Sequence, residues 1–490
     1  MRATVAAEIR LHAPIPQPLA DAICEALTID NPEYLTAEKQ GRWTGDMEST
    51  IRGWRRHLKG GMVIPRGFGR QLRQLCTRHD EPLEVDWQMS RGTKPLVGRE
   101  LAPMLTPRDY QAAAVDAMLQ AKQGMVVAPT GAGKTVIGCL AVGRANVPAL
   151  ILTHTHELAD QWRESFDRVF GLKTGIVGGG EDQRHPVTVA MVQTLHRWSD
   201  DDVAAFGAGF GMVLADEVQH LGAQSWYRLI NLMPCLYRFG VTATPTREDG
   251  LTELLHWAIG PIVYRIEHAS LEDAGHLMAP EVVPVKTGWT WPAWDEASDK
   301  LQQAEADGAN EWKLRALKRK RDQLFAKLLN AIAEDDERNQ ILIELIADQV
   351  HDGRTVLVLS QRVAHCERLC AALEAIGVES GVLVGKTPKR ARADILGRFR
   401  GGSLPVVLAS SLADEGLDAP SIDCMVNAMP ARHKGRTVQR IGRLMRPMEG
   451  KRRPVMFDLV DSLGVLRGQW ASRKSAYKSI GAEIRPWYTS

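Results

Sequence analysis

A lysine and a threonine directly follow a small glycine-containing loop in the segment Met125-Val-Val-Ala-Pro-Thr-Gly-Ala-Gly-Lys-Thr-Val136. The apolar start of this segment indicates a strand, and the apolar pattern that follows it indicates a helix. Backbone amides and the helix dipole at such a junction favour phosphate, which Lys134 would bind while the Thr135 hydroxyl holds Mg²⁺. The nucleotide-binding residues predicted from this loop are Thr130, Gly131, Ala132, Gly133, Lys134 and Thr135.

Two adjacent acids end another apolar strand, in the segment Met212-Val-Leu-Ala-Asp-Glu217. Beside a phosphate loop, one acid at a strand end can hold Mg²⁺ and its neighbour can orient and deprotonate the attacking water. We therefore expect Asp216 to bind the metal and Glu217 to act as the general base. A further strand ends at Thr242 and Thr244, whose hydroxyls could hydrogen-bond to the acidic motif and sense its state.

Two more polar features fit the same nucleotide. Gln111 precedes the helix expected at Ala113–Ala121, and its amide can both donate to and accept from an adenine edge. In the second half of the chain, Arg440, Arg443 and Arg446 have i, i+3, i+6 spacing along one side of a helix. Guanidinium groups pair with phosphate oxygens, so these arginines could reach a γ-phosphate from a neighbouring lobe.

The bulk composition is that of a globular protein with several domains. The chain has 490 residues, of which 44% are hydrophobic and 24% charged, and three or four domains are expected. A net charge of +2 means that any nucleic-acid surface must come from local patches. The seven cysteines are scattered, and only Cys366 and Cys370 are close, without the second pair that a zinc site needs. Apolar runs too short for a bilayer and no evident signal peptide predict a reduced, cytoplasmic protein.

The first 95 residues are predicted to form a small α+β domain with strands at Val5–Leu11, Thr50–Leu58 and Leu83–Trp87 and helices at Pro18–Leu27 and Phe68–Arg78. Between Arg42 and His79 lie nine basic residues with Trp43, Trp54 and Phe68 among them. This mixture suits phosphate contact and base stacking, and Arg52, Arg55 and Arg56 are the DNA-contact candidates. A solvated basic face with the aromatic residues in a small core is the alternative.

Three later segments complete the outline. Ser90–Pro103 is polar and marked by Pro and Gly, as expected for a linker. Residues 289–338 indicate a helical insertion with tryptophans and a basic run that could grip a nucleic-acid backbone, although a solvated bridging helix explains them equally well. Gly385-Lys386-Thr387 mimics a phosphate loop, but Pro388 follows at once. A nucleic-acid backbone contact through Lys386 is therefore preferred to a second ATP site.

Taken in order, these motifs resemble those of superfamily 2 helicases over about residues 104–460. Within that superfamily, the chain is similar to the branch that contains XPB and the phage helicase UvsW. The residues that carry this resemblance are Arg108-Asp-Tyr-Gln111, Thr242-Ala-Thr-Pro245 and the triplet Arg247-Glu-Asp249. Asp216-Glu-Val-Gln-His220 differs from the Asp-Glu-Ala-Asp of the RNA-remodelling branch, which favours DNA over RNA as the natural substrate.

The resemblance implies an α/β fold with two RecA-like parallel-sheet lobes in tandem, a small α+β N-terminal domain and a helical insertion between the lobes. ATP would bind in the cleft between the lobes. It also implies further site residues. They are Arg108, Gly416 and Asp418 for the nucleotide, Gln439 beside the arginines for catalysis, His220 for coupling, and Thr153, His154, Gln193, Thr194, Arg247, Gln361, Arg362 and Ser410 for nucleic acid.

The expected domains are a DNA-recognition-like domain at 1–95, the first lobe at 96–288, a thumb-like insertion at 289–338 and the second lobe with a helical tail at 339–490. The expected function is that of an ATP- and Mg²⁺-dependent DNA helicase or translocase acting on branched or damaged DNA. Its partner would be single-stranded, forked or branched DNA, with an RNA–DNA hybrid also possible. The protein would be a monomer. It would act in the cytoplasm of a bacterial or phage-infected cell, at the nucleoid.

Two other functions remain open. The chain could be the translocating subunit of a restriction or defence system, which would need a nuclease, methylase or docking segment that another subunit could supply. It could also be an ATP-gated clamp that binds DNA without travelling along it. Strand-displacement and triplex-displacement assays would separate these functions.

Overall fold

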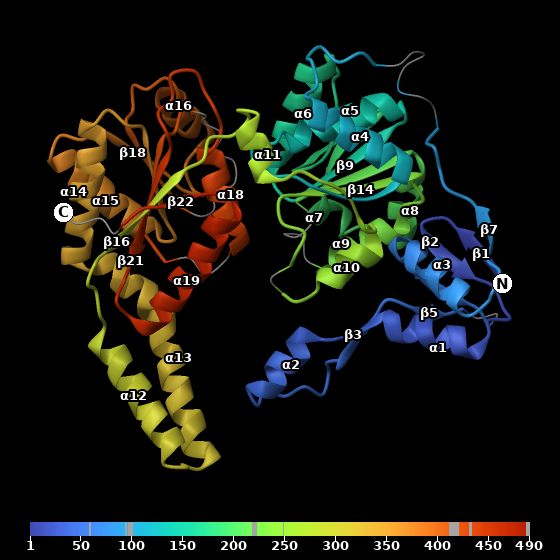
Figure 1. The fold of residues 1–490 in the computed structure, drawn as a ribbon, viewed down its shortest axis with the longest axis horizontal. Helices are drawn as coiled ribbons and strands as arrows, with labels where there is room; N and C mark the ends of the chain where they lie inside the picture. Colours follow the sequence, from blue (N-terminus) through green and yellow to red (C-terminus); the bar gives the residue numbers. More distant parts are fainter. Residues whose placement is uncertain are drawn as a thin grey trace. The chain divides into compact units, whose positions relative to one another are not determined.

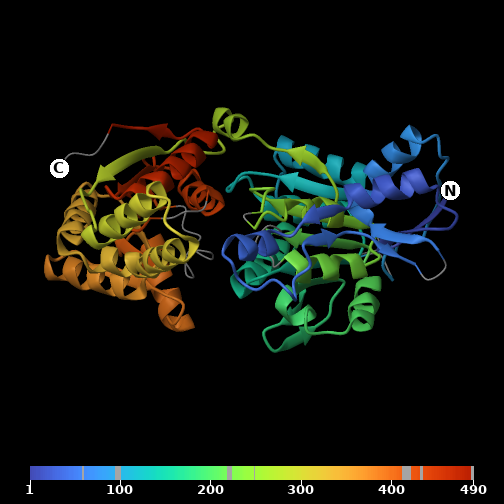
Figure 2. The same ribbon diagram turned by 90° about the horizontal axis from the view of Figure 1, so that it is seen from below.

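The computed structural model describes residues 1–57, 60–93, 96, 101–217, 223–247, 249–410, 421–430 and 434–486; within these, the side chains of residues 223, 224, 326, 389, 434–436, 439 and 443 are not described. The chain divides into two compact units, Met1–Glu267 and His268–Ser490. Figures 1 and 2 show a sheet flanked by helices in each unit. Within the described residues, no helix is both long and apolar enough to cross a membrane.

The first unit begins with a small α+β domain, as predicted. Its five-stranded sheet has the order β5-β6-β2-β1-β7. The strands are β1 (Arg2–Val5), β2 (Glu8–Leu11), β5 (Arg55–Arg56), β6 (Met62–Pro65) and β7 (Glu84–Trp87). The helical segments are α1 (Gln17–Ala26), η1 (Arg66–Phe68) and α3 (Gly69–Arg78). A separate excursion comprises β3 (Thr28–Asp30), α2 (Pro32–Lys39) and β4 (Thr50–Arg52).

Two of the strand predictions for this domain were wrong in detail. The single strand expected at Val5–Leu11 is an antiparallel pair, β1 and β2, in which Val5 pairs with Ile9 across a tight turn. The strand expected from Thr50 is interrupted at Gly53. A Cβ at Gly53 would lie 2.7 Å from the Trp257 ring, so the chain passes too close to the first lobe there for any larger residue.

The rest of the first unit is a lobe built on a nearly all-parallel sheet with the order β11-β10-β12-β9-β13-β14-β8-β15. Its strands are β8 (Gln123–Val127), β9 (Ala149–Thr153), β10 (Gly175–Gly178), β11 (Glu181–Gln183), β12 (Val187–Met191), β13 (Met212–Asp216), β14 (Tyr237–Thr242) and β15 (Ile262–Arg265). Its helices are α4 (Asp109–Ala121), α5 (Lys134–Ala145), α6 (His156–Phe170), α7 (Val192–Leu195), α8 (Asp200–Ala208), α9 (Ala223–Leu232) and α10 (Thr252–Ala258). Strands β9 and β13 are buried along their whole length, as expected for parallel strands covered on both faces.

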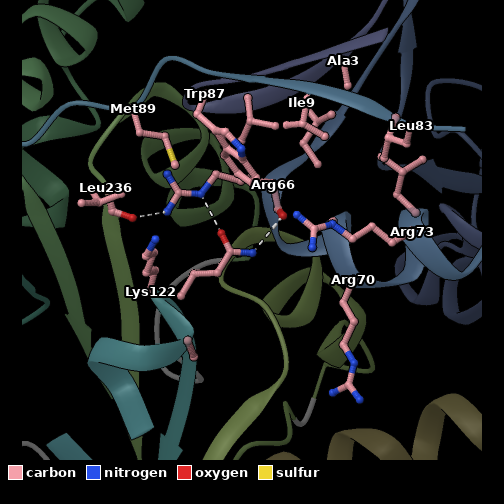
Figure 3. Close-up of a pocket in the computed structure, with 16 residues that line it drawn as sticks. Ala3, Ile9, Arg66, Arg70, Arg73, Leu83, Trp87, Met89, Lys122 and Leu236 are labelled. Carbon is pink, nitrogen blue, oxygen red and sulfur yellow. Dashed lines mark hydrogen bonds between the residues drawn. The ribbon is translucent and has the colours of Figure 1, made fainter. Parts of the chain in front are cut away.

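The N-terminal domain is docked on this lobe through a shared core and a buried arginine. Leu254 and Trp257 of α10 belong to the hydrophobic core of the N-terminal domain. The Arg66 side chain is buried, donating to Gln123 Oε1 at 2.7 Å and to the Leu236 carbonyl at 3.0 Å (Figure 3). A cavity of about 260 Å³ lies beside this contact, with Arg73 and Trp87 among the residues that line it. The N-terminal domain and first lobe thus form one structural unit.

The second unit has a parallel sheet with the order β18-β19-β17-β20-β21-β16-β22. Its strands are β16 (Glu281–Lys286), β17 (Val356–Ser360), β18 (Ser380–Leu383), β19 (Val406–Ser410), β20 (Cys424–Asn427), β21 (Val455–Val460) and β22 (Glu483–Ile484). Its helices are α11 (His268–Asp273), α12 (Pro292–Ala306), α13 (Glu311–Glu334), α14 (Asp336–His351), α15 (Val363–Ala375), α16 (Lys389–Arg400), α18 (Lys434–Leu444) and α19 (Gly464–Ser479). Strand β16 pairs with β21, so the sheet of the second unit takes in residues that the sequence placed in the first lobe.

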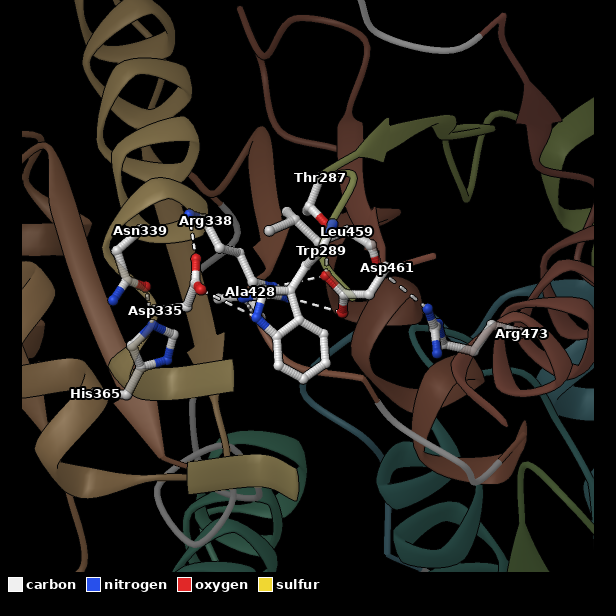
Figure 4. A network of polar contacts seen from close by, with 10 residues as sticks. All are labelled: Thr287, Trp289, Asp335, Arg338, Asn339, His365, Ala428, Leu459, Asp461 and Arg473. Carbon is white, nitrogen blue, oxygen red and sulfur yellow. Dashed lines mark hydrogen bonds and ion pairs between the residues drawn. The ribbon is translucent and has the colours of Figure 1, made fainter. Parts of the chain in front are cut away.

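Helices α12 and α13 form a hairpin that projects from the second unit (Figure 1). Trp289 and Trp294 are buried at its base, packed with Leu328 and Leu463, so these two tryptophans belong to the core. Trp312, near the tip, is 78% exposed. Figure 4 shows how the base is fastened, with Arg338 Nε donating to Asp461 Oδ1 at 2.7 Å.

Candidate functional site

The phosphate loop lies where the sequence predicted it, between β8 and α5. Gly131 and Gly133 have φ angles of 91° and 77°, the left-handed region that glycine adopts without strain. A Cβ at Gly133 would lie 2.7 Å from Gln111 Nε2, so the turn is also closely packed. Helix α5 begins at Lys134, and no side chain caps its N-terminus. The first backbone amides of a helix have no partner within the helix, which makes a helix N-terminus a favourable site for an anion.

Lys134 and Glu217 form an ion pair across the loop. The Lys134 Nζ–Glu217 Oε1 distance is 3.3 Å, and the side chains are 11% and 14% exposed. Glu217 has a φ of 45°, an uncommon value for a residue with a side chain, and its backbone amide donates to the Val241 carbonyl at 3.0 Å. The predicted phosphate ligand and the predicted general base are therefore neighbours, and strand β14 supports the backbone that carries the base.

Asp216 lies at the buried end of β13. Burial, followed by the neighbouring Glu217, raises the pKa of its carboxyl to about 6, against the opposing effects of Trp162, Lys134 and His154. The indole Nε1 of Trp162 donates to Asp216 Oδ2 at 2.8 Å. Asp216 is thus a buried carboxylate with a cation nearby, which suits a residue that binds a divalent metal.

These residues fit Mg²⁺ and a nucleoside triphosphate. Among the described residues, Thr130 Oγ1 is buried without a hydrogen-bond partner, beside the loop amides. No group of three or more His, Cys, Asp or Glu side chains in the described part of the chain could hold a metal by itself. Mg²⁺ bound with a nucleotide takes one or two protein ligands and completes its shell with phosphates and water. Thr135 and Asp216 would be those ligands.

Gln111 is packed against the phosphate loop. Its Oε1 accepts from the Arg108 amide at 3.0 Å, and its Nε2 donates to the Ala132 carbonyl at 3.3 Å. Tyr110, which sequence reasoning did not single out, donates its hydroxyl to the same carbonyl at 3.1 Å and accepts from Arg108 at 2.9 Å. Arg108, Tyr110 and Gln111 therefore hold the loop in place, and the adenine contact of Gln111 stays a prediction.

Strand β14 connects the loop to the next motif. The Ala128 amide donates to the Thr242 carbonyl at 3.0 Å, which ties the start of the loop to the end of β14. The Thr242 hydroxyl donates to the Thr244 carbonyl at 2.9 Å and accepts from the Thr244 amide at 3.0 Å. Thr242 and Thr244 thus close a local turn. His220, the expected coupling partner, lies outside the described residues.

The predicted nucleic-acid residues of the first lobe differ in accessibility. Gln193 Nε2 donates to the His154 carbonyl at 2.7 Å, so these two segments lie together, with Thr194 beside them. Thr153 has no exposed surface, so its side chain is not accessible in this structure, and its contact with nucleic acid stays a prediction. The Arg247 side chain is only 6% exposed and pairs with Asp249, with Nε–Oδ1 at 3.0 Å, so it stabilises its own loop.

In the N-terminal domain, the three predicted DNA-contact arginines have different surroundings. Arg55 donates to both carboxylate oxygens of Glu8, one of them at 2.7 Å, which compensates its charge. The Arg52 guanidinium lies 5.9 Å from the Trp54 ring centroid. Arg56 is exposed. Arg52 and Arg56 are the stronger candidates for phosphate contact.

The second unit contains the remaining predicted residues. Ser360 Oγ accepts from the Arg362 amide at 3.2 Å, and Gln361 Nε2 donates to the Pro430 carbonyl at 2.8 Å. Lys386 is exposed, whereas Ser410 is 4% exposed. Arg446 follows helix α18 and is half-buried. Gly416 and Asp418, and the side chains of Gln439 and Arg443, lie outside the described residues.

Two family models match the chain. Residues 104–247 match the family described as "Type III restriction enzyme, res subunit", and residues 337–448 match "Helicase conserved C-terminal domain". A protein of Sulfurisphaera tokodaii named DNA 3'-5' translocase XPB2 is 31% identical over 361 residues, which cover 69% of this chain and 78% of the relative. The chain spans only 52%, 57% and 52% of the next three relatives.

A solved structure supports the fold. The Saccharomyces cerevisiae protein Dbp5, solved bound to RNA and ADP BeF3, aligns over 78% of this chain and 90% of its own with a TM-score of 0.52 and 14% identity. The crystal structure of T4 UvsW covers 100% of this chain and 99% of its own at 17% identity with a TM-score of 0.42. Together with the parallel sheets of both units, the likeness to Dbp5 confirms the predicted α/β fold with two RecA-like lobes. The chain belongs to the XPB family of superfamily 2 helicases and is an enzyme of the ATP-dependent DNA helicase class.

Proposed function

We propose that this protein couples ATP hydrolysis to 3'–5' movement along DNA and remodels branched or damaged DNA at the nucleoid. The observation that carries the proposal is the group of Lys134, Asp216 and Glu217. These residues lie beyond the carboxyl ends of the parallel strands β8 and β13, on either side of β14, where α/β sheets bind ligands. The S. tokodaii relative is named a DNA 3'-5' translocase, which supports the polarity.

The first lobe would bind the nucleotide through the phosphate loop. Bound ATP would supply the electrophilic γ-phosphorus, and the Mg²⁺ bound with it would neutralise part of the negative charge of the phosphates. Lys134 would leave Glu217 for the β- and γ-phosphates, and this exchange would free Glu217 to orient and deprotonate a water. Asp216 and Thr135 would hold the metal, and Gln111 and Arg108 would position the nucleotide from the side of α4.

The second unit would complete the site. Arg443 and Arg446, on and directly after α18, would bind the γ-phosphate, with Gln439, Gly416 and Asp418 beside them. Because the phosphate loop and α18 lie in different units, hydrolysis would need both units to close around the nucleotide. Thr242, Thr244 and His220 would relay this state to the DNA-binding residues, and alternating closure and opening would step the lobes along one strand.

Replacing Lys134 tests the ATP site. Lys134→Ala should abolish DNA-stimulated ATP hydrolysis, because the loop would lose the cation that binds the phosphates. Lys173→Ala, an exposed lysine in the same lobe, is the control and should hydrolyse ATP like the wild type. If the Lys134→Ala variant hydrolyses ATP at the wild-type rate, the proposed ATP site is wrong.

The N-terminal domain is proposed to contact DNA through Arg52 and Arg56. Reversing both charges should weaken DNA binding at low salt and reduce the dependence of affinity on salt, while unstimulated ATP hydrolysis stays the same. The exposed pair Arg2 and Arg10, in the same domain but outside the basic stretch between Arg42 and His79, is reversed in the same way and controls for the change in net charge. If the wild type and the Arg52/Arg56 variant bind DNA with equal affinity at low salt, these arginines belong to a solvated face that does not contact DNA.

A second candidate is the translocating subunit of a restriction or defence system. The match of residues 104–247 to the res subunit of type III restriction enzymes favours it. Displacement of a triplex without unwinding of a fork, Holliday junction or R-loop would support this candidate. Unwinding or migration of those junctions would support the repair and recombination role. If the protein binds DNA in the presence of ATP but shows neither triplex displacement nor junction unwinding, the ATP-gated clamp is the function that remains.

A further inference from the structure

A buried tryptophan contacts the predicted metal-binding carboxylate. Trp162, on α6, has no exposed surface, and its indole Nε1 donates to Asp216 Oδ2 at 2.8 Å. No role follows for it from the sequence motifs. Because the residues are 54 positions apart in the chain, only the fold brings them together.

The indole ring is fixed from the side of the phosphate-loop helix. At Gly138 of α5, an added Cβ would lie 2.4 Å from Trp162 Cη2 and 3.0 Å from a methyl group of Leu214 on β13. The Phe166 ring, one turn further along α6, packs at a centroid distance of 6.1 Å. Trp162 is therefore wedged between α5 and β13, the two elements that carry Lys134 and Asp216.

A carboxylate at the end of a strand can rotate about its last bond, which would present either oxygen to a metal. A neutral N–H that donates to one oxygen fixes this rotation and leaves the other oxygen for the metal. Hydrogen bonds of this kind to metal-binding carboxylates orient the ligand, and their loss typically weakens metal binding.

We propose that Trp162 is a positioning residue for ATP hydrolysis, whose indole N–H holds Asp216 in the orientation that binds the nucleotide-associated Mg²⁺. The inference rests on the role proposed for Asp216. It makes α6 a structural link between the segment around His154, at the start of that helix, and the metal site.

The test measures metal affinity without turnover. Mn²⁺ replaces Mg²⁺ as the probe, and its binding to the complex of the full chain with ADP is measured by electron paramagnetic resonance. Trp162→Phe should weaken Mn²⁺ binding about ten-fold, while ADP affinity in the presence of EDTA stays within two-fold. Unchanged Mn²⁺ affinity in Trp162→Phe would overturn the proposal.

Trp226→Phe is the matched control. Trp226 is also buried in the first lobe, and its Nε1 has no hydrogen-bond partner among the described residues. The control therefore makes the same change in volume without removing a hydrogen bond, and it should keep wild-type Mn²⁺ affinity. An equal loss in both variants would attribute the effect to packing and also overturn the proposal.

Two additions keep the test decisive. Trp162→3-benzothienylalanine keeps the shape of the ring and removes only the N–H, so it replaces Trp162→Phe if that variant does not fold. Asp216→Asn tests the underlying role: if it keeps wild-type Mn²⁺ affinity, the assigned metal site itself is wrong. If Asp216→Asn loses Mn²⁺ and the Trp162 variants keep it, the Trp162 inference alone is wrong.

Discussion

Lys134 and Glu217 form an ion pair in the described structure, and this ion pair can make hydrolysis depend on the binding of the nucleotide. Their 3.3 Å ion pair lies in a largely buried setting, where charges interact more strongly than in water. A triphosphate offers Lys134 several negative oxygens in place of one carboxylate. The incoming nucleotide would therefore break this ion pair in the same step in which it binds, which would link the proposed base to the presence of its substrate.

His365 provides a prediction on pH. Burial, followed by the nearby cations Arg338 and Arg368, lowers the pKa of His365 from 6.5 to about 3. The folded protein keeps this side chain neutral, between Ser360 and Asn339, whereas the unfolded chain binds a proton below pH 6.5. Between pH 6.5 and about 3 the unfolded state therefore binds more protons, and stability falls by about 1.4 kcal/mol per pH unit as the pH decreases.

Hydrogen exchange at pH 7 and 5.5, corrected for the intrinsic pH dependence, should show this loss in the peptides of β17 and α15. His365→Gln should remove the pH dependence, whatever its effect on absolute stability. His351→Gln, at an exposed position of α14, serves as the control and should keep it. The same pH dependence in wild type and His365→Gln would mean that another group is responsible.

At this scale, the sequence predicted the residues that act through their own chemical type. Lys134, Asp216 and Glu217 are recognisable because a phosphate loop and a strand-end acid pair have local signatures, and the structure brings them together. Tyr110 and Trp162 were missed because their roles depend on partners 22 and 54 residues away. The environment of Arg247 was unpredictable for the same kind of reason, since its burial arises from packing and not from spacing.

The elements that place these residues follow one geometric rule. In a parallel sheet, the carboxyl ends of all strands meet at one edge, so the loops after β8, β9, β13 and β14 are neighbours although the chain separates them. Apolar runs that end in polar residues therefore predicted the strands that lead to the phosphate loop and to the acid pair, and the resemblance to superfamily 2 helicases implied the two sheets. The antiparallel pairing of β1 with β2 and the pairing of β16 with the second sheet were not predictable. Both depend on which strands pair in the folded protein, and the sequence of one strand does not specify this.

Gly67 provides a prediction on the junction between η1 and α10. An added Cβ there would lie 2.2 Å from the His256 carbonyl oxygen and 2.4 Å from that of Trp257. Both atoms are backbone, so neither can move aside without a shift of the helix end. Gly67→Ala should therefore destabilise the first unit by about 3 kcal/mol, the upper range for overpacking, in urea unfolding.

The control lies two residues away. At Gly69 an added Cβ would come no closer than 3.4 Å, to the flexible end of Ile9, which is ordinary contact. Gly69→Ala should leave the unfolding midpoint close to that of the wild type. If both variants unfold alike, the docking of the N-terminal domain on α10 does not depend on close approach at Gly67.

At the scale of the whole molecule, the division into two units separates the two halves of the proposed site. Met1–Glu267 contains the phosphate loop and the acids, and His268–Ser490 contains α18 with its arginines. Each unit has its own buried core, so each holds its part of the site in shape by itself. In the proposed mechanism, the first unit then suffices for nucleotide binding, while hydrolysis requires residues of both units.

Arg443 tests this separation. Arg443→Ala should keep ATP affinity within a few-fold, because the phosphate loop is intact, and should lower the rate of DNA-stimulated hydrolysis about 10³-fold, the lower range for arginines that stabilise phosphoryl transfer. Binding is measured by titration with a fluorescent ATP analogue, and hydrolysis by phosphate release. Arg467→Ala, an exposed arginine on α19, is the control and should match the wild type in both. If Arg443→Ala hydrolyses ATP normally, α18 takes no part in the chemistry, and the first unit must complete the site without the second.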